Sequence, residues 1–386
     1  MSGGVLRPVC TAALAALVVT SPAAAAPVPP AAGSTPTGTN RSVTQLLSEL
    51  RQLYQQAEEA TETYNGTAAE LKKRAAQAKK LDIALVAART ALADSRDEAG
   101  RLAREQYQGR SDFSAYMRLL LSRDPEHLLD QEHVIRRAAA GRAATVQRLT
   151  GAEKHADELA TESRKVLDRQ QVLAAKQKKQ RDTVRSRLKA VESMLAKLSS
   201  PQLTELSRLE QRDMEKAQGA LVASGALSST RPPSEAGGEA VKYAIGQVGK
   251  PYVWGAEGPD SFDCSGLTSQ AWAKAGRVIP RTSQEQWRQL RKVPTNALRP
   301  GDLVIYFPKA THVAMYIGNG LVVQAPRPGS RVKVSPVASN PLLGAVRPDP
   351  QSAPLSTYRP PRLPQGASSG SDAGYGSSSA PSGSGQ

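Results

Sequence analysis

A seven-residue spacing in the first half of the chain constrains its fold more than any other feature. The first series is Leu71, Ala78, Leu85, Leu92 and Ala99. The second series is Ala138, Thr145, Ala152, Leu159, Val166 and Leu173. A seven-residue repeat keeps one stripe of a helix facing a partner helix. Residues 41–218 are therefore predicted to form a coiled-coil domain, with a structural stalk as the plain alternative to a functional role.

Two interruptions indicate how the helices are connected. The pattern breaks at residues 109–114 and again at Pro125, which has no N–H to continue a helix. We expect a hairpin of two long antiparallel helices, with the apolar stretch 113–129 as its turn or a small cap. Pro201 should end the second helix, and the Ser, Pro and Gly of residues 219–238 predict a linker.

The amino-terminal residues have the pattern of a secretory signal peptide. Arg7 precedes the apolar run 11–19, and small residues follow at 23–26. The run is too short to cross a bilayer. We expect residues 1–26 to be removed, together with Cys10, and residues 27–40 to be a linker. The mature protein should then be secreted to the cell wall or the extracellular space, with no transmembrane segment.

The net charge of +16 and the pI of about 9.9 favour a polyanionic partner. Nucleic acid, an anionic membrane and an anionic cell-wall polymer all satisfy this requirement. In the coiled coil the basic residues are spread over the helix faces with acids among them. A nucleic-acid partner is therefore not expected for a secreted chain.

Residues 239–348 predict a compact α+β domain. A short amphipathic helix begins near Glu239, and two more helical patterns follow before Pro300. Strand patterns then follow at 302–307, 312–317, 321–324, 332–334 and 344–346. The Asn319-Gly320 pair predicts a hairpin between two of them. Helices followed by antiparallel strands indicate the α+β class. Residues 349–386, rich in Pro, Ser and Gly, are expected to be a disordered tail.

Cys264 is the one cysteine left if the signal peptide is removed. It is then a buried free thiol, an intermolecular link or a reactive nucleophile. Its position predicts the first turn of a helix, where the macrodipole should lower the thiol pKa. His312 is the one histidine of the compact domain and opens a predicted strand. In a papain-like site the cysteine lies on a helix and the histidine on a strand, and the predicted elements agree with this arrangement.

Several motifs resemble the NlpC/P60 family of cell-wall endopeptidases, over about residues 239–348. The central ones are Asp-Cys-Ser-Gly-Leu at 263–267 and His-Val-x-x-Tyr-Ile-Gly-Asn-Gly at 312–320. Supporting stretches are Pro-Tyr-Val-Trp-Gly at 251–255, Pro-Arg-Thr-Ser at 280–283 and Arg-Pro-Gly-Asp-Leu at 299–303. The preceding coiled coil is similar to that of actinobacterial division hydrolases.

The resemblance implies a papain-like fold and roles for six residues. Cys264 would be the nucleophile and His312 its acid–base partner. Gln324 would orient His312, although the family more often has histidine there; a solvent-facing strand residue is the alternative. Tyr252 would support the oxyanion, and Asp263 and Ser265 would bind the free amine of a stem peptide. Asp263 also fits a helix N-cap.

The implied activity is hydrolysis of stem-peptide bonds in peptidoglycan, usually between the γ-carboxyl of D-glutamate and a diamino acid. Two alternatives remain open: a non-catalytic scaffold that binds the wall, and an amidase or acyltransferase on the same fold. We expect no cofactor and no metal. A membrane-bound divisome or regulatory partner of the coiled coil is also expected, and the coiled coil is predicted to restrain the compact domain.

Overall fold

The computed structural model describes residues 42–108 and 125–368. The predicted signal peptide and the linker at 27–40 lie outside these residues. So do most of the stretch expected to form the hairpin turn and the end of the predicted tail. These expectations stay predictions. No helix within the described ranges is both long enough and apolar enough to cross a membrane.

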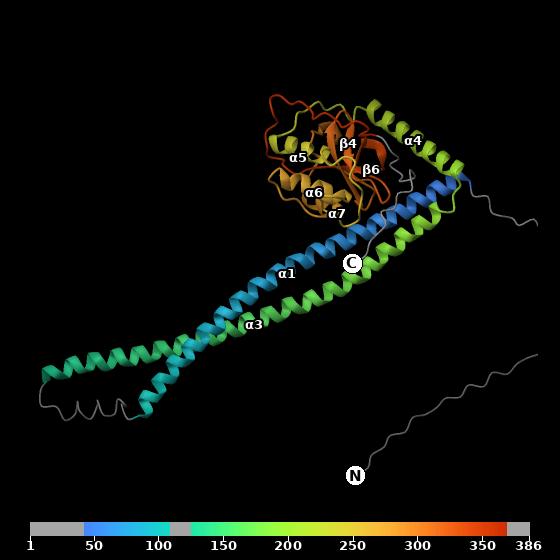
Figure 1. Ribbon diagram of the computed structural model, residues 1–386. Helices are drawn as coiled ribbons and strands as arrows, with labels where there is room; N and C mark the ends of the chain where they lie inside the picture. The colour runs from blue at the N-terminus through green and yellow to red at the C-terminus, as the bar shows by residue number, and fades with distance from the viewer. Residues whose placement is uncertain (1–41, 109–124, 369–386) are drawn as a thin grey trace, which may run out of the picture. The chain divides into compact units, whose positions relative to one another are not determined.

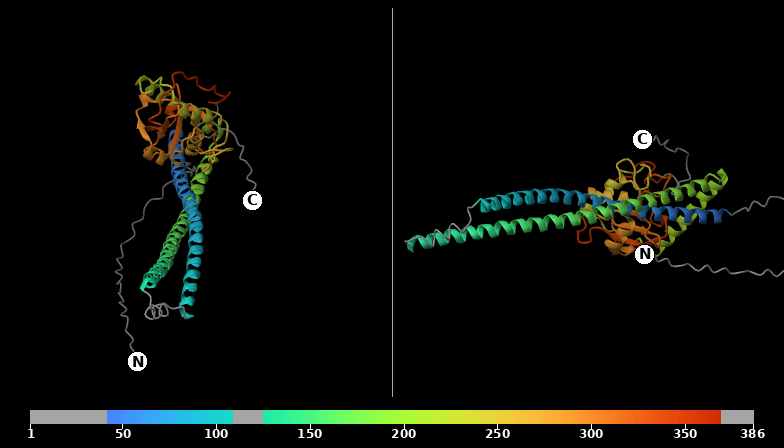
Figure 2. Two further views of the ribbon diagram at one scale, coloured as in Figure 1. Left: turned by 90° about the vertical axis from the view of Figure 1, so that its left-hand side faces the viewer. Right: turned by 90° about the horizontal axis from the view of Figure 1, so that it is seen from below.

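The predicted helical hairpin is confirmed. α1 (Val43–Tyr107) and α3 (Pro125–Leu195) lie side by side in each view (Figures 1 and 2). Their contacts are antiparallel, since Gln56 near the start of α1 accepts a 2.9 Å hydrogen bond from Arg187 and Glu98 near its end accepts one of 2.6 Å from Arg148. Ser42 begins α1 with a capping box that satisfies backbone N–H groups.

The chain changes direction before Pro201, as predicted. Ser199 caps a further helix, α4 (Ser200–Ala223), and Pro201 lies in its first turn, where a missing N–H costs nothing. Leu206 of α4 is buried against Leu46 and Leu47 of α1. The next helix, α5 (Glu235–Ile245), begins inside the stretch expected to be a linker, and α4 also extends into it.

The compact domain is a six-stranded antiparallel sheet with helices, in the order β1-β6-β2-β3-β4-β5. Its elements are α5, α6 (Cys264–Lys274), α7 (Ser283–Gln289), β1 (Arg291–Val293), β2 (Leu303–Tyr306), β3 (His312–Gly318), β4 (Leu321–Gln324), β5 (Lys333–Pro336) and β6 (Leu342–Arg347), with short 3-10 turns at Thr295–Ala297 and Val337–Ser339. The five predicted strands are present. The edge strand β1 was not predicted.

Both faces of the sheet are covered, which explains why its central strands are apolar throughout. Side chains alternate across a strand, so Leu303 and Ile305 of β2 face the core that α5 and α6 complete. Val304 and Tyr306 face the other side, where Leu221 of α4 packs. At this second face, the Gln218 amide donates to Gly320 O and accepts from Ala338 N, each at 3.0 Å.

Residues 349–368 contact the domain. Arg299 and Asp349 form a buried ion pair at 2.9 Å, and Ser234 donates to the same carboxylate. Further along, Ala367 is buried, and its carbonyl oxygen accepts from the N–H of Val334 in β5. Stable contacts of the domain thus extend from Ser234 to Ala367, beyond both predicted limits.

Candidate active site

Cys264 is the first residue of α6, and the local sequence explains its position. The carboxylate of Asp263 caps the helix by accepting a 2.6 Å hydrogen bond from the N–H of Gly266. A Cβ at position 266 would lie 2.2 Å from the carbonyl oxygen of Ala256, so only glycine fits there. The resulting turn directs the Cys264 sulfur toward β3.

His312 and Gln324 lie on the paired strands β3 and β4. His312 Nε2 is 2.8 Å from Gln324 Oε1, and the Gln324 amide also donates to Ser339 Oγ at 3.3 Å. An amide oxygen only accepts hydrogen bonds, so Nε2 carries the proton in this arrangement. The other ring nitrogen, Nδ1, is then the one available to a reacting group.

The nucleophile and the histidine come together because α6 packs against β3. The backbone N–H of Val313, the residue after His312, donates to the Cys264 sulfur. Cys264 and His312 are both buried. The structure thus brings together the three residues predicted to be catalytic.

Tyr252 is buried beside this group. An isolated β-bridge pairs it with Phe262, two residues before Cys264 in the sequence. Burial raises the pKa of Tyr252 well above its usual value, and the charge of Cys264 adds to this effect. Its phenol is therefore neutral and able to donate a hydrogen bond near the sulfur.

Asp263 and Ser265 form a polar cluster with Arg281. Arg281 donates to both carboxylate oxygens of Asp263, at 3.1 and 2.7 Å, and to Ser265 Oγ at 2.8 Å. The N–H of Gly255 donates to the same carboxylate at 2.9 Å. Asp263 therefore acts as a helix cap and as a buried acceptor, so the two interpretations of this residue are compatible.

A carboxylate from α1 enters this cluster. Glu62 Oε1 accepts from Ser265 Oγ at 2.7 Å and lies 3.8 Å from the Cys264 sulfur. Glu62 Oε2 accepts from the N–H of Ser283 at 2.6 Å and lies 2.9 Å from the Ser283 hydroxyl, which is also 2.7 Å from the carbonyl oxygen of Ala310. The Ser265 hydroxyl and the Ser283 N–H thus hold this carboxylate next to the sulfur.

Two neighbours of Glu62 on α1 also reach the site. Asn65 Nδ2 donates to Asp263 Oδ2 at 2.9 Å, and Glu58 Oε1 lies 3.5 Å from His312 Nδ1. Tyr54 stacks against Arg327 at 4.4 Å on the same helix face. Spacings of three and four residues place these side chains on one stripe of α1. This stripe covers Cys264, His312 and Asp263, the carboxylate expected to bind the substrate amine.

The packing of α1 reverses the expected ionisation of the thiol. Burial raises the pKa of Cys264 well above its usual value, and the charges of Glu62, Asp263 and Glu58 raise it further. The expectation of a lowered pKa is therefore wrong for this arrangement, because desolvation and three carboxylates outweigh the helix N-terminus. Cys264 is a neutral thiol here.

The α1 carboxylates are themselves perturbed. Burial raises the pKa of Glu58 to about 8 and that of Glu62 to about 7. Glu58 Oε2 is buried without a hydrogen-bond partner among the described residues. A charge at this oxygen is unfavourable, so Glu58 is held mainly as the neutral acid at neutral pH.

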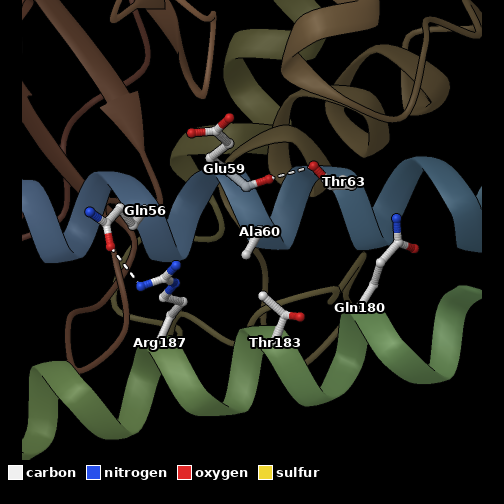
Figure 3. Close-up of a pocket in the computed structure, with 7 residues that line it drawn as sticks. All are labelled: Gln56, Glu59, Ala60, Thr63, Gln180, Thr183 and Arg187. Carbon is white, nitrogen blue, oxygen red and sulfur yellow. Dashed lines mark hydrogen bonds between the residues drawn. The ribbon is translucent and has the colours of Figure 1, made fainter. Parts of the chain in front are cut away.

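Behind this stripe, α1 and α3 are not fully packed. A gap of about 310 Å³ lies between the helices, lined by Gln56, Glu59, Ala60, Thr63, Gln180, Thr183 and Arg187 (Figure 3). The small side chain of Ala60 leaves part of this space open.

Sequence reasoning missed five residues of this site: Glu58, Glu62, Asn65, Arg281 and Ser283. Those of α1 were placed on solvent faces of a coiled coil. One signal was present, since Asn65-Gly66-Thr67 are three poor helix formers inside a long helix. Such a local conflict often marks a functional contact.

A helix-borne cysteine packed on a sheet that supplies a histidine and an amide defines the papain-like class of cysteine hydrolase folds. Comparison with known families agrees: residues 249–344 match the NlpC/P60 family. The compact domain thus matches this family, and the predicted α+β fold and the resemblance are confirmed.

Individual relatives cover only this part of the chain. A "probable endopeptidase" of Corynebacterium glutamicum is 39% identical over 132 residues, 34% of this chain and 63% of the relative. The peptidoglycan endopeptidase RipA of Mycolicibacterium smegmatis is 42% identical over 126 residues, 28% of this chain and 25% of the relative. The chain thus spans less than two thirds of these curated relatives.

Among solved structures, the NlpC/P60 domain of the peptidoglycan hydrolase SagA is 34% identical. The match covers 29% of this chain and 97% of that one, with a TM-score of 0.27.

Proposed function

We propose that this protein is a secreted peptidoglycan endopeptidase that uses Cys264 as its nucleophile. The observation that carries the proposal is the grouping of Cys264, His312 and Gln324 within the stretch that matches the family. Relatives named as endopeptidases over the same stretch support it. The cell wall is the proposed place of action, and a division or regulatory partner of the hairpin remains a prediction.

The chemistry follows from the residues. The Cys264 thiolate attacks the amide carbonyl, and the imidazolium of His312 protonates the leaving amine. Water then hydrolyses the thioester with His312 as the base. Gln324 keeps Nδ1 of His312 facing the reaction, and the neutral phenol of Tyr252 supports the oxyanion.

The contacts of α1 support a stem-peptide substrate. A γ-linked glutamyl residue keeps a free α-carboxylate beside the scissile bond. Glu62 occupies such a carboxylate position, bound by Ser265 and Ser283. Asn65 donates an N–H to Asp263, as a substrate amine would. This pairing supports cleavage between D-γ-glutamate and a diamino acid.

We propose further that the arrangement is an inhibited state. Cys264 is only 2% exposed, so a substrate carbonyl cannot reach its sulfur while α1 is in place. The inhibition also acts on the ionisation of the thiol, because burial, with a further contribution from the charge of Glu62, raises the pKa of Cys264 and disfavours the thiolate that the reaction needs. Moving α1 away removes the steric and the electrostatic block together.

The test uses the full-length chain on purified sacculi, with mass spectrometry of the released muropeptides. Glu62→Ala and Asn65→Ala should raise the initial rate roughly tenfold or more, since a charge-assisted hydrogen bond contributes about 1.5–3 kcal/mol. Glu59→Ala is the matched control, because Glu59 lies on the same helix and forms an exposed ion pair with Lys309 of the compact domain, a contact that contributes little.

Each alternative gives its own result. New termini between glutamate and the diamino acid support the endopeptidase. Release of whole stems from the glycan would indicate an amidase, and new cross-links an acyltransferase. If neither Glu62→Ala nor Asn65→Ala releases any new product, a non-catalytic scaffold would be favoured.

A further inference from the structure

The net charge of the chain is concentrated in one part of the hairpin. Residues 71–80 and 164–179 contain eleven Lys and Arg and one Asp, a net charge of +10 out of +16 for the whole chain. We call these two segments the basic band. Its cations are Lys72, Lys73, Arg74, Lys79, Lys80, Arg164, Lys165, Arg169, Lys176, Lys178 and Lys179.

The two segments lie at the same level of the hairpin. Thr63 of α1 and Gln180 of α3 line one gap on the near side, and Asp82 and Ser163 are 3.5 Å apart on the far side. The band lies between these two levels. Its cations are exposed except Arg74, which is partly buried and paired with Glu70 at 2.8 Å.

The stability of the hairpin does not explain this charge. Lys165 and Arg169 are four residues apart and Lys176 and Lys179 three, spacings at which like charges destabilise a helix. Farther along, the helices use opposite charges instead, with Arg96 pairing with Glu153 at 3.1 Å. Within the described ranges, Arg74 is the one band residue in an ion pair.

The distribution of side chains decides between possible polyanions. A helix that binds a membrane surface needs an apolar face beside its cations. Ala78 and Val166 are instead buried in the seam. Leu167 and Val172 are exposed, but five positions separate them, about 140° around the helix, so they form no common face.

We propose that the basic band binds a flexible polymer that carries one phosphate charge per repeat, as anionic polymers of cell walls can. Exposed lysines on both helices suit a chain that can follow the rod, and the interaction needs no base or headgroup. The first cation of the band, Lys72, lies seven residues beyond Asn65, about 10 Å along α1. A bound polymer would hold the compact domain beside the wall, independently of the cysteine chemistry.

The experiment measures binding of the full-length chain to labelled long-chain inorganic polyphosphate at several salt concentrations. The test variant carries Lys72→Gln, Lys73→Gln, Lys79→Gln and Lys80→Gln. The control carries the same charge change at the exposed Lys154, Lys197, Lys216 and Lys274. Circular dichroism confirms that both variants keep their helices.

The wild type should bind with an affinity that falls steeply with salt. The band variant should bind at least tenfold more weakly at low salt, with a salt slope lower by about 3, at roughly 0.7 per phosphate contact. The control variant should stay near wild type.

Three results would overturn the proposal: no binding by the wild type, equal losses in both variants, or binding to vesicles of anionic phospholipid without binding to polyphosphate. The last would assign the band to a membrane.

Discussion

The carboxylate of Glu62 accepts a 2.7 Å hydrogen bond from Ser265, the residue that follows the nucleophile. The two are 203 positions apart in the sequence. Through this contact Glu62 of the hairpin binds Ser265, a residue expected to bind the substrate. The same carboxylate lies next to Cys264 and adds to the rise in its pKa. The proposed catalytic site and its proposed restraint are therefore one polar cluster.

Cys264→Ser should abolish muropeptide release without unfolding the protein. A serine hydroxyl is far less ionised than a thiol at neutral pH, and the proposed site depends on a thiolate. Cysteine and serine at position 264 should be compared in a chain that also carries Glu62→Ala, because that change is expected to open the site. Substantial cleavage by the serine variant would rule out the cysteine mechanism.

The closed state should weaken as the pH rises. Burial raises the pKa of Glu58 to about 8 and that of Glu62 to about 7, above the usual 4.5 of the open state. Closing therefore takes up protons, so its stability is complete below about pH 4.5 and is lost as the pH rises toward 8. The rate at which an alkylating reagent modifies Cys264 measures the opening.

A double variant and the isolated compact domain together separate this opening from ionisation of the thiol itself. Glu58→Gln with Glu62→Gln keeps neutral side chains of the same shape, so Cys264 should stay protected at pH 9. The isolated compact domain reports the intrinsic thiol reactivity. If the double Gln variant opens with the same pH profile as wild type, these carboxyls do not control closure.

Gln324 should orient His312 without adding charge. Gln324→Ala should fold but lose rate in the open background, by up to roughly 10⁴ if the wrong tautomer forms. Gln324→Glu should keep activity and extend the alkaline limb of the pH–rate profile, because a carboxylate favours the imidazolium. Profiles identical to wild type for both variants would mean that another group holds the ring.

Asp349 should be essential for stability although it lies beyond the predicted domain. Asp349→Ala leaves Arg299 as a buried unpaired charge, which should cost about 3–5 kcal/mol in the free energy of unfolding. Urea unfolding followed by tryptophan fluorescence measures this loss. Glu285→Ala breaks an exposed pair with Arg288 and should cost less than about 1 kcal/mol. Similar losses for the two variants would contradict a structural role of the tail.

Short-range patterns were sufficient for much of the fold. The heptad spacing predicted α1 and α3, because helix periodicity acts within a few residues. Pro201 predicted a helix end before it, and α3 does end at Leu195, but Pro201 itself lies in the first turn of α4. Alternation and turn residues predicted the five strands from β2 to β6. β1 was missed, since Arg291–Val293 is a short polar edge strand defined only by its pairing with β6.

By itself, the sequence predicted Cys264, His312 and Gln324 as catalytic residues, because each lies in a local motif on its own helix or strand. Only the tertiary structure revealed that Glu58, Glu62 and Asn65 cover them. Periodicity reports which face of a helix is apolar, and a polar stripe on a coiled coil is assigned to solvent. The partners of this stripe lie about two hundred residues away, and their burial reverses the thiol pKa that the helix position alone predicts.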